Sequence, residues 1–448
     1  MVQPFVIAPR WVAPVTAGSP LLAGHGVLVD GERIAAVAPL EDLRASHPVA
    51  PLFERPGHLL IPGLINTHCH AAMSLLRGLG DDLPLMSWLE DRIWPAERAL
   101  VSEDFVHDGA MLGCLEMVLG GITCFSDMYF FPESTARAAR ELGMKVMVGI
   151  VVFEFPSAYG AGPDDYIARG LALRDRLRDD QGILFSFAPH APYTVSDRSF
   201  TRIATLAAEL ELPITTHLHE TAGEIEQSLK EHGVRPIERL ARLGLLGPDF
   251  LAVHGVHLND DDLRLLAEVG ASVAHCPHSN LKLASGIAPV ARMLAAGINV
   301  TIGTDGAASN NRLDLLSEAR TATLLAKGSS GDAAAFASRR VLESLTRGAA
   351  HALGIDDQTG SIETGKAADL VAVDLSPHEP VHDPVSTLIH ASGREAVTDV
   401  WIDGRHVVEG RQMHDPVSLT ALSGVLGRRS LWHNRLGEFV PGCAVSRV

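Results

Sequence analysis

The sequence predicts an α/β protein in which a (β/α)8 barrel is joined to a small, discontinuous β-sandwich domain formed by both ends of the chain. Three observations predict this fold. Short apolar runs of strand length alternate with helical segments through the middle of the chain. Each end of the chain instead carries a hairpin signal, and polar residues gather where the central runs end.

The central part of the chain contains eight apolar runs, separated by segments in which apolar residues have helical spacing. The runs are residues 59–66, 121–128, 145–153, 183–190, 212–220, 250–258, 271–279 and 299–307. Eight strand–helix units over about 300 residues suit a (β/α)8 barrel. A doubly wound open sheet has the same local alternation, so the strand count alone does not exclude it.

Both chain ends contain turn dipeptides between alternating apolar and polar residues, a pattern typical of β-hairpins. Asp30-Gly31 lies within residues 26–38, and Asp403-Gly404 lies within residues 397–410. We expect the two ends to pair into one domain. The predicted limits are 1–58 together with 362–448 for the β-sandwich, and 59–361 for the barrel.

The composition is that of a globular protein. Of 448 residues, 46% are hydrophobic and 20% are charged, so the chain has ample apolar material for a core. A formal net charge of −17 repels phosphate backbones, which argues against nucleic acid as a partner. No window reaches about 18 uninterrupted apolar residues, and the start of the chain lacks a signal-peptide pattern, so we expect a cytoplasmic protein with no membrane partner.

The cysteines do not indicate a disulfide framework or a thiolate zinc site, because they are scattered, odd in number and without CxxC spacing. They are Cys69, Cys114, Cys124, Cys276 and Cys443.

His68 and His70 are the first candidates for a metal site. They stand one residue apart at the end of an apolar run, and on a strand the side chains of residues i and i+2 leave on the same face. Two neutral imidazoles suit zinc or another borderline divalent metal, and a catalytic site needs one or two further ligands. Two histidines in this pattern can also be ordinary polar residues at the end of a strand that bind no metal.

Three later runs end in residues that could complete this site. His217 and His219 share a face by strand period, so the spacing leaves open which of them binds. Glu220 follows them, but the helix dipole also favours a carboxylate in the first turn of a helix. His254 ends the sixth strand, and Asp305 ends the eighth, where it could equally cap a helix. All of these residues fall at the carboxyl ends of predicted strands, the face on which barrel enzymes carry their chemistry.

Five stretches of the chain resemble one known family. They are PGLINTHCH, THLHE, VHGVHL, HCPHSNLKL and TIGTDGAASNN. From about residue 5 to 435 the chain resembles the amidohydrolase superfamily, and within it the purine-deaminating branch that includes 5′-methylthioadenosine/S-adenosylhomocysteine deaminases and is related to the triazine chlorohydrolases. The resemblance implies a metal-dependent aminohydrolase that acts on the C–N bond of a cyclic amidine.

The resemblance also implies roles for individual residues. The zinc ligands would be His68, His70, His217 and Asp305, which favours His217 over His219. The catalytic set would be Glu220, which moves protons, His254, which holds the attacking hydroxide, and Asp305, which takes its proton. The substrate would be contacted by Trp88, Glu97, His190, Glu220, Asp305 and Ser309.

The fourth predicted strand bears on the number of metal ions. Binuclear members of the superfamily bridge their metals with a modified lysine at the end of this strand, but residues 183–195 contain no lysine. We therefore expect one Zn2+ per chain, and the same ligands would also accept iron, manganese or cobalt.

The region after the third predicted strand bears on the substrate. Members that act on S-adenosylhomocysteine are expected to bind its carboxylate there with arginines, but residues 151–170 contain none before Arg169 and are acidic at Asp164 and Asp165. We expect deamination of 5′-methylthioadenosine to 5′-methylthioinosine and ammonia, with S-adenosylhomocysteine and adenosine as poorer substrates. The alternatives are a guanine or 8-oxoguanine deaminase, an s-triazine hydrolase on the same scaffold, and a non-catalytic scaffold protein.

The C-terminal stretch 419–440 is apolar and contains a tryptophan. It predicts an amphipathic helix that packs either on the barrel or on another subunit. The second arrangement would make the protein a homo-oligomer.

Overall fold

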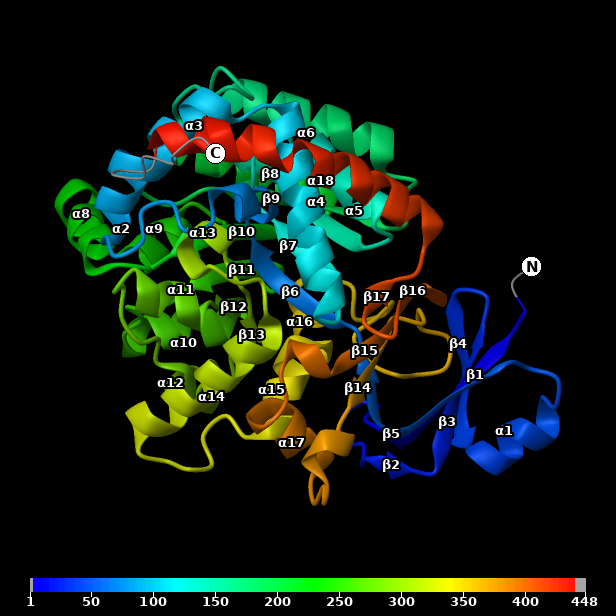
Figure 1. Cartoon of the computed structure of the whole chain (residues 1–448). Helices are drawn as coiled ribbons and strands as arrows, with labels where there is room; N and C mark the ends of the chain where they lie inside the picture. The colour runs from blue at the N-terminus through cyan, green and yellow to red at the C-terminus, as the bar shows by residue number, and fades with distance from the viewer. Residues whose placement is uncertain (1–2, 440–448) are drawn as a thin grey trace.

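Eight parallel strands form one of the two sheets in the computed structural model, which describes residues 3–439 (Figure 1). The strands are β6 (Leu64–Cys69), β7 (Ile122–Asp127), β8 (Lys145–Val152), β9 (Ile183–Pro189), β10 (Ile214–Leu218), β11 (Phe250–His254), β12 (Ser272–His275) and β13 (Asn299–Ile302). Each strand lies beside its neighbour in the chain, from β6 to β13. A doubly wound sheet reverses its strand order part-way, so this uninterrupted order confirms the predicted barrel.

The last strand, β13, lies against the first, β6, and so brings the sheet almost to closure. Thr67 Oγ1 and Thr301 Oγ1 are 2.8 Å apart, and the Asp305 amide donates to the His68 carbonyl oxygen at 3.1 Å. Gly303 stands at the closest approach, where a Cβ atom would lie 2.9 Å from the Cβ of His68. Closure therefore places Asp305 beside the histidines of the first strand.

Helices follow the strands and cover the outside of the barrel (Figure 1). In α7, Ser196 caps the first turn by accepting from the Ser199 amide, and Phe200, Ile203 and Ala207 repeat at helical spacing on the buried face. The helices are α4 (Glu103–Leu119), α5 (Pro132–Glu141), α6 (Pro163–Leu177), α7 (Asp197–Leu210), α8 (Ala222–His232), α9 (Pro236–Arg242), α10 (Asp260–Val269), α11 (Pro277–Lys282), α12 (Val290–Ala295), α13 (Ala307–Asn310), α14 (Leu315–Ser330), α15 (Ser338–Leu345) and α16 (Arg347–Ala352).

The second sheet is mixed and joins both ends of the chain. Its strands are β1 (Phe5–Val12), β2 (Leu22–Ala23), β3 (His25–Asp30), β4 (Arg33–Pro39), β5 (Leu52–Pro62), β14 (Leu370–Asp374), β15 (Val397–Ile402), β16 (Arg405–Glu409) and β17 (Gln412–Met413), accompanied by α1 (Leu40–Ser46) and α17 (Pro384–His390). Their order is β17-β16-β15-β14-β5-β1-β3-β4, with β2 paired to β1. Arg33 bridges to Ala367, and Trp401 is buried in the core that the sheet encloses. The predicted small β-domain is confirmed.

The entry into the barrel differs from the prediction. The sequence predicts one strand for residues 59–66, but 59–62 belong to β5 and pair with β14, and the barrel strand begins only at Leu64. The apolar run hides the change of sheet because every residue from 59 to 66 is buried. We therefore propose a domain limit at Gly63 in place of 58/59, and the limit at 361/362 stays a prediction.

The predicted C-terminal helix is α18 (Pro416–Leu436), which crosses over α4 and α5 on the outside of the barrel (Figure 1). Arg428 Nε donates to Asp108 Oδ2 at 2.8 Å, and Trp432 Nε1 donates to the same oxygen at 2.8 Å. Of the two predicted positions, the helix thus occupies the one on its own barrel. The last residue of the predicted stretch, and Cys443, lie outside the described residues.

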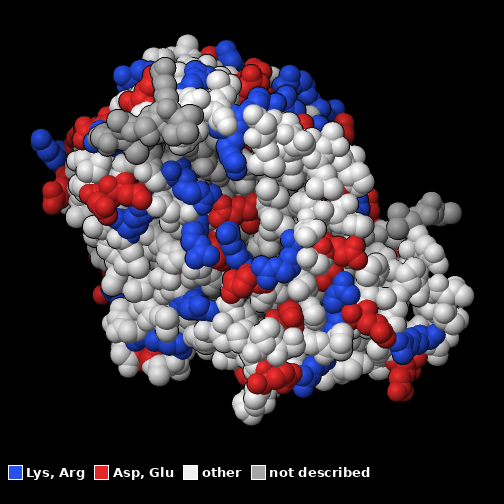
Figure 2. Space-filling view, viewed as in Figure 1, with Lys and Arg blue, Asp and Glu red and all other residues white. Residues whose placement is uncertain are grey.

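On the face drawn in Figure 2, Lys and Arg side chains lie among Asp and Glu side chains. Within residues 3–439, no helix combines the length and the apolar character needed to cross a bilayer.

Candidate active site

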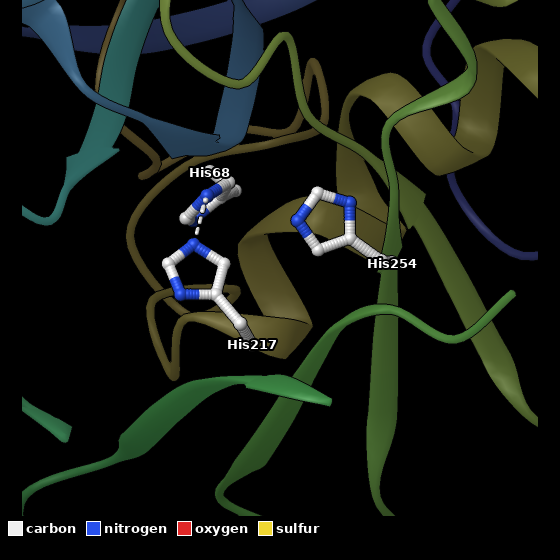
Figure 3. A group of neighbouring side chains, drawn as sticks. All are labelled: His68, His217 and His254. Carbon is white, nitrogen blue, oxygen red and sulfur yellow. Dashed lines mark hydrogen bonds between the residues drawn. The ribbon is translucent and has the colours of Figure 1, made fainter. Parts of the chain in front are cut away.

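Four potential metal ligands meet at the carboxyl end of the barrel. His68 lies in β6, His70 directly follows it, His217 lies in β10, and Asp305 follows β13. The Nε2 atoms of His68 and His217 are 3.2 Å apart (Figure 3). Asp305 Oδ1 lies 3.2 Å from His70 Nε2 and 3.6 Å from His68 Nε2. The first, fifth and eighth strands therefore contribute to one centre.

The imidazoles of this centre are oriented through their other nitrogen atoms. His70 Nδ1 is 2.6 Å from the Met128 carbonyl oxygen, and His217 Nδ1 is 2.7 Å from the His190 carbonyl oxygen. A carbonyl oxygen only accepts, so each Nδ1 carries a proton and each Nε2 faces the centre. Burial lowers the pKa of His68 to about 4, which leaves that ring neutral at pH 7. Burial likewise lowers the pKa of His217, so these two rings are in the form that binds a cation. At His70 burial is outweighed by the hydrogen bond to Asp305, which raises the pKa of that ring, and a cation would take the place of its Nε2 proton.

Asp305 supplies the anionic oxygen of the centre. Its Oδ2 accepts from Ser279 Oγ at 2.5 Å and from Ser309 Oγ at 2.8 Å, and its Oδ1 accepts from the Gly306 amide at 2.8 Å. Burial alone would raise the pKa of Asp305, but hydrogen bonds from the two neighbouring histidines hold it well below its usual range. Asp305 is therefore a carboxylate at neutral pH.

His254 and Glu220 stand on the other side of the centre. His254 Nδ1 is 2.8 Å from Asn280 Oδ1, which leaves its Nε2 facing Glu220 Oε2 at 3.8 Å. Burial raises the pKa of Glu220, so that this carboxyl group can hold a proton more readily than an exposed glutamate. Two groups of residues bring possible ligand atoms within 4.8 Å of one another, and His68 belongs to both. The first group is His68, His70 and Asp305, and the second is His68, His217 and His254.

His219 lies outside the centre, although strand alternation places it on the same face as His217. Strand β10 ends at Leu218, and the φ angle of His219 is +55°, so the alternation stops there. The ring of His219 is buried and turns away from the centre. Its Nε2 accepts from the Ile237 amide at 3.2 Å, and its Nδ1 lies 3.5 Å from Asp262 Oδ2. The geometry thus places His217, and not His219, beside the other candidate ligands.

A cavity of about 720 Å³ lies against this centre. Its other walls are mostly apolar and include Leu85, Trp88, Phe153 and Phe155. All of the predicted substrate contacts line it: Trp88, Glu97, His190, Glu220, Asp305 and Ser309. The structure therefore brings the predicted residues together around one cavity, next to the candidate metal ligands.

Glu97 lines the cavity from α3 (Trp94–Leu100), together with the acidic residues Glu220 and Asp305. Tyr129 Oη donates a 2.6 Å hydrogen bond to Glu97 Oε1. Burial raises the pKa of Glu97 to about 7, and the Tyr129 hydrogen bond partly opposes this rise. Glu97 therefore changes charge near neutral pH.

Aromatic side chains shape the remaining walls. Trp88, at the end of α2 (Leu85–Trp88), is buried and donates from Nε1 to the Leu79 carbonyl oxygen at 3.2 Å. The His190 ring stacks on Phe153, with centroids 4.6 Å apart, and burial lowers the pKa of His190 to about 3. His190 is therefore a neutral ring at the cavity wall.

Several residues of the site are absent from the sequence prediction. Tyr129 and Phe153 follow the ends of β7 and β8, so an aromatic residue just after a barrel strand is the signal that could have found them. Residues 153–158 bring no basic side chain to the cavity, in line with the expectation, but Arg98 lines it from α3. No feature of the sequence indicated that Asn280 would orient His254.

Comparison with known proteins gives consistent matches over nearly the whole chain. The model of the amidohydrolase family matches residues 59–407, and that of the bacterial imidazolonepropionase-like composite domain matches 26–48. A 5-methylthioadenosine/S-adenosylhomocysteine deaminase of Saccharophagus degradans is 46% identical, covering 91% of this chain and 92% of the relative. One of Teredinibacter turnerae is 44% identical, covering 95% and 96%.

Solved structures resemble the chain as well. An adenosine deaminase from Xanthomonas campestris with bound zinc is 44% identical, with a TM-score of 0.94, covering 97% of this chain and 98% of that one. An atrazine chlorohydrolase from Arthrobacter aurescens complexed with zinc has a TM-score of 0.87 at 24% identity, covering 96% and 99%, and shows the shared fold.

Proposed function

The chain belongs to the amidohydrolase family, and we propose that it is a zinc-dependent deaminase of adenosine-type nucleosides that acts best on 5′-methylthioadenosine. The protein is a hydrolase of carbon–nitrogen bonds. One observation carries the narrower proposal: a buried carboxyl group, Glu220, faces His254 beside the candidate metal ligands, and a largely apolar cavity, which Glu97 also lines, continues from them. Two nearly full-length relatives are named 5-methylthioadenosine/S-adenosylhomocysteine deaminase.

The donor set fits one zinc ion. We propose His68, His70, His217 and Asp305 as its ligands, because three neutral imidazoles and a carboxylate suit zinc, and zinc is bound in the structure of the Xanthomonas relative. Iron, manganese or cobalt would suit the same donors. We leave His254 out of the set because its Nε2 faces Glu220.

Metal analysis can distinguish the proposed ligands from His254, which lies beside them. Zinc-loaded His217→Asn protein is expected to lose its metal during dialysis, whereas His254→Asn protein is expected to keep about one ion per chain, with the metal measured by mass spectrometry. Loss of zinc from both variants would make His254 a ligand, and retention by both would remove His217 from the set.

The chemistry of deamination assigns a role to each buried group. A bound zinc ion lowers the pKa of water toward neutrality and so supplies a nucleophile. Asp305, already ionised, accepts the proton of the attacking water, and His254 holds that oxygen as it bonds to C6 of the purine. Glu220, whose pKa burial raises, delivers a proton to the ring nitrogen beside C6. The proton accepted by Asp305 passes to the amino group, which leaves as ammonia while the C6 hydroxyl becomes a carbonyl and its proton returns to Glu220.

The cavity suits a nucleoside with a small apolar 5′ group. The carboxylate of Glu97 can accept hydrogen bonds from ribose hydroxyls, and Trp88 offers an apolar wall for an alkylthio group. Arg98 is the basic side chain of the described lining, and it is exposed. One exposed guanidinium anchors a carboxylate weakly, so we propose that S-adenosylhomocysteine and adenosine are poorer substrates.

Steady-state deamination tests this proposal. The zinc-loaded protein is incubated with 5′-methylthioadenosine, adenosine and S-adenosylhomocysteine, and with guanine, 8-oxoguanine and an s-triazine, while ammonia and ultraviolet absorbance are followed. We expect the largest kcat/KM for 5′-methylthioadenosine. An equal or larger value for S-adenosylhomocysteine would contradict the preference, and activity confined to the free bases or the triazine would contradict the proposed function. A cytoplasmic location and a homo-oligomeric state stay predictions.

A further inference from the structure

Glu224 is a buried acid that lies behind the candidate active site. It occupies the third position of α8, three residues after Thr221, whose side chain caps the helix by accepting from the Glu224 amide. Its side chain is 5% exposed, and it does not belong to the described cavity lining. The proposed chemistry therefore does not use it directly.

The carboxylate of Glu224 binds the turn that carries Glu220. Its Oε1 accepts from the His219 amide at 2.9 Å, and its Oε2 accepts from the Glu220 amide at 2.9 Å. In an ordinary capping box, a glutamate at this position would reach back only to the amide of the capping residue, here Thr221. Glu224 instead reaches one and two residues farther, to the segment between β10 and α8.

This segment needs support because its backbone is strained. His219 has a φ angle of +55°, a left-handed conformation that costs a residue with a side chain about 1 kcal/mol or more and persists only where neighbouring contacts impose it. The ring of His219 is fixed on the outside by the Ile237 amide. Glu224 fixes the same residue through its backbone, and it fixes the next peptide group as well.

The two hydrogen bonds determine where the Glu220 side chain points. The Glu220 amide and its side chain leave the same Cα, so anchoring the amides on both sides of the turn sets the direction in which the carboxyl group approaches His254. We propose that Glu224 is a positioning residue that holds Glu220 in the geometry required for proton transfer. The inference rests on the proposed function, in which Glu220 moves protons.

Replacement of Glu224 by Gln provides the test. An amide side chain keeps the shape but offers one oxygen for two backbone N–H groups and turns its own N–H2 group toward the other one. Because a displacement of about 1 Å costs about 10²-fold in rate, we expect kcat for 5′-methylthioadenosine to fall about 10²-fold. KM should change by less than about threefold, since Glu224 makes no contact with the cavity.

Glu226→Gln is the matched control, because Glu226 is exposed on the same helix two residues later. This control should keep the wild-type kcat. Zinc content and melting temperature are measured for every variant, and Glu224→Asp, which keeps the carboxyl group but is one methylene shorter, serves as a second variant. A zinc-bound, folded Glu224 variant with wild-type kcat would overturn the inference, and so would a loss confined to KM or proportional to lost zinc.

Crystal structures separate this inference from the proposed function. If the wild-type protein releases no ammonia from any nucleoside, the proposed function fails, but the position of Glu220 can still be compared between zinc-loaded wild-type and Glu224→Gln crystals. We expect the Glu220 carboxyl group to move by about 1 Å or more relative to His254. Coincident Glu220 positions would overturn the positioning role whatever the substrate.

Discussion

The hydrogen bond from Tyr129 to Glu97 gives a prediction whose size follows from its geometry. In the Tyr129→Phe variant the ring stays but the 2.6 Å hydrogen bond to Glu97 Oε1 is lost. A hydrogen bond to a charged group contributes about 1.5–3 kcal/mol, or about 10- to 150-fold in an equilibrium constant. Glu97 faces a cavity in which water can replace part of that bond, so we expect the lower end, about a tenfold rise in KM for 5′-methylthioadenosine with little change in kcat.

The pH dependence of the same variant has a definite sign. Burial raises the pKa of Glu97 to about 7, and the hydrogen bond from Tyr129 lowers it because it stabilises the carboxylate. Removal of the hydroxyl therefore raises the pKa, and a smaller fraction of Glu97 is ionised at pH 7. The acid limb of kcat/KM, which reports groups of the free enzyme, should move to higher pH by about one unit, since 1.5 kcal/mol corresponds to about one pKa unit.

The assay is a series of initial rates between pH 5.5 and 9 for wild type, Tyr129→Phe and a control, Tyr193→Phe. Tyr193 lines the same cavity and, among the described residues, has no hydrogen bond to Glu97. The control should keep the wild-type acid limb. If Tyr129→Phe leaves both KM and the acid limb where they are in the wild type, Glu97 is not the group that binds the ribose.

Four further predictions test the site and its support. Glu220→Gln should bind 5′-methylthioadenosine with a Kd near the wild-type KM yet lower kcat by about 10³-fold or more, as measured by calorimetry and ammonia release, and near-normal turnover would remove Glu220 from proton transfer. Arg98→Met should lower kcat/KM for S-adenosylhomocysteine by about two- to fivefold and spare 5′-methylthioadenosine, whereas equal losses for both would assign Arg98 no carboxylate contact. Asp108→Asn should reduce the free energy of unfolding in urea by about 1–3 kcal/mol, because Arg428 and Trp432 lose a charged acceptor. Since Arg428 holds the pKa of the buried Asp108 well below its usual range, the wild type should lose this stability only below about pH 4. If the difference in unfolding free energy between wild type and Asp108→Asn is the same at about pH 3 as at about pH 7, this origin of the stability is contradicted. Removal of metal with a chelator should abolish activity, and about one equivalent of zinc should restore it; a need for two would contradict a mononuclear site.

The fold could be predicted from the sequence because its signals are local and repeated. The barrel strands lie in apolar runs, and two hairpins of the small domain carry Asp-Gly turns, at Asp30-Gly31 and Asp403-Gly404. The step from β5 to β6 could not be predicted, since residues 59–66 are buried throughout and the pattern does not change where the chain passes from one sheet to the other. The change depends on pairing with β14, which lies about 300 residues later.

The site was predictable to the extent that its residues end strands. His68, His254 and Asp305 were found in this way, and the structure places each at the carboxyl end of the barrel. Asn280 acts through a hydrogen bond to His254, and nothing in its immediate sequence distinguishes it from other polar residues. Tyr129 shows only that an aromatic residue follows a strand, which does not indicate its hydrogen bond to Glu97. Their roles depend on contacts between elements distant in sequence, which only the tertiary structure reveals.

Three residues explain why periodicity fails at the site itself. His219, His254 and Asp305 all have positive φ angles, of +55°, +74° and +59°, directly at or after the ends of their strands. Strand alternation assumes extended backbone, so it holds for His68 and His70 but ceases to apply once the chain turns into the left-handed region. Hydrogen bonds from other elements fix these residues, as Asn280 does for the His254 ring and Glu224 does for the His219 amide. The groups proposed to transfer protons and to hold the attacking oxygen therefore depend on partners that carry no catalytic signature, and loss of such a partner should reduce activity while the fold and the metal remain.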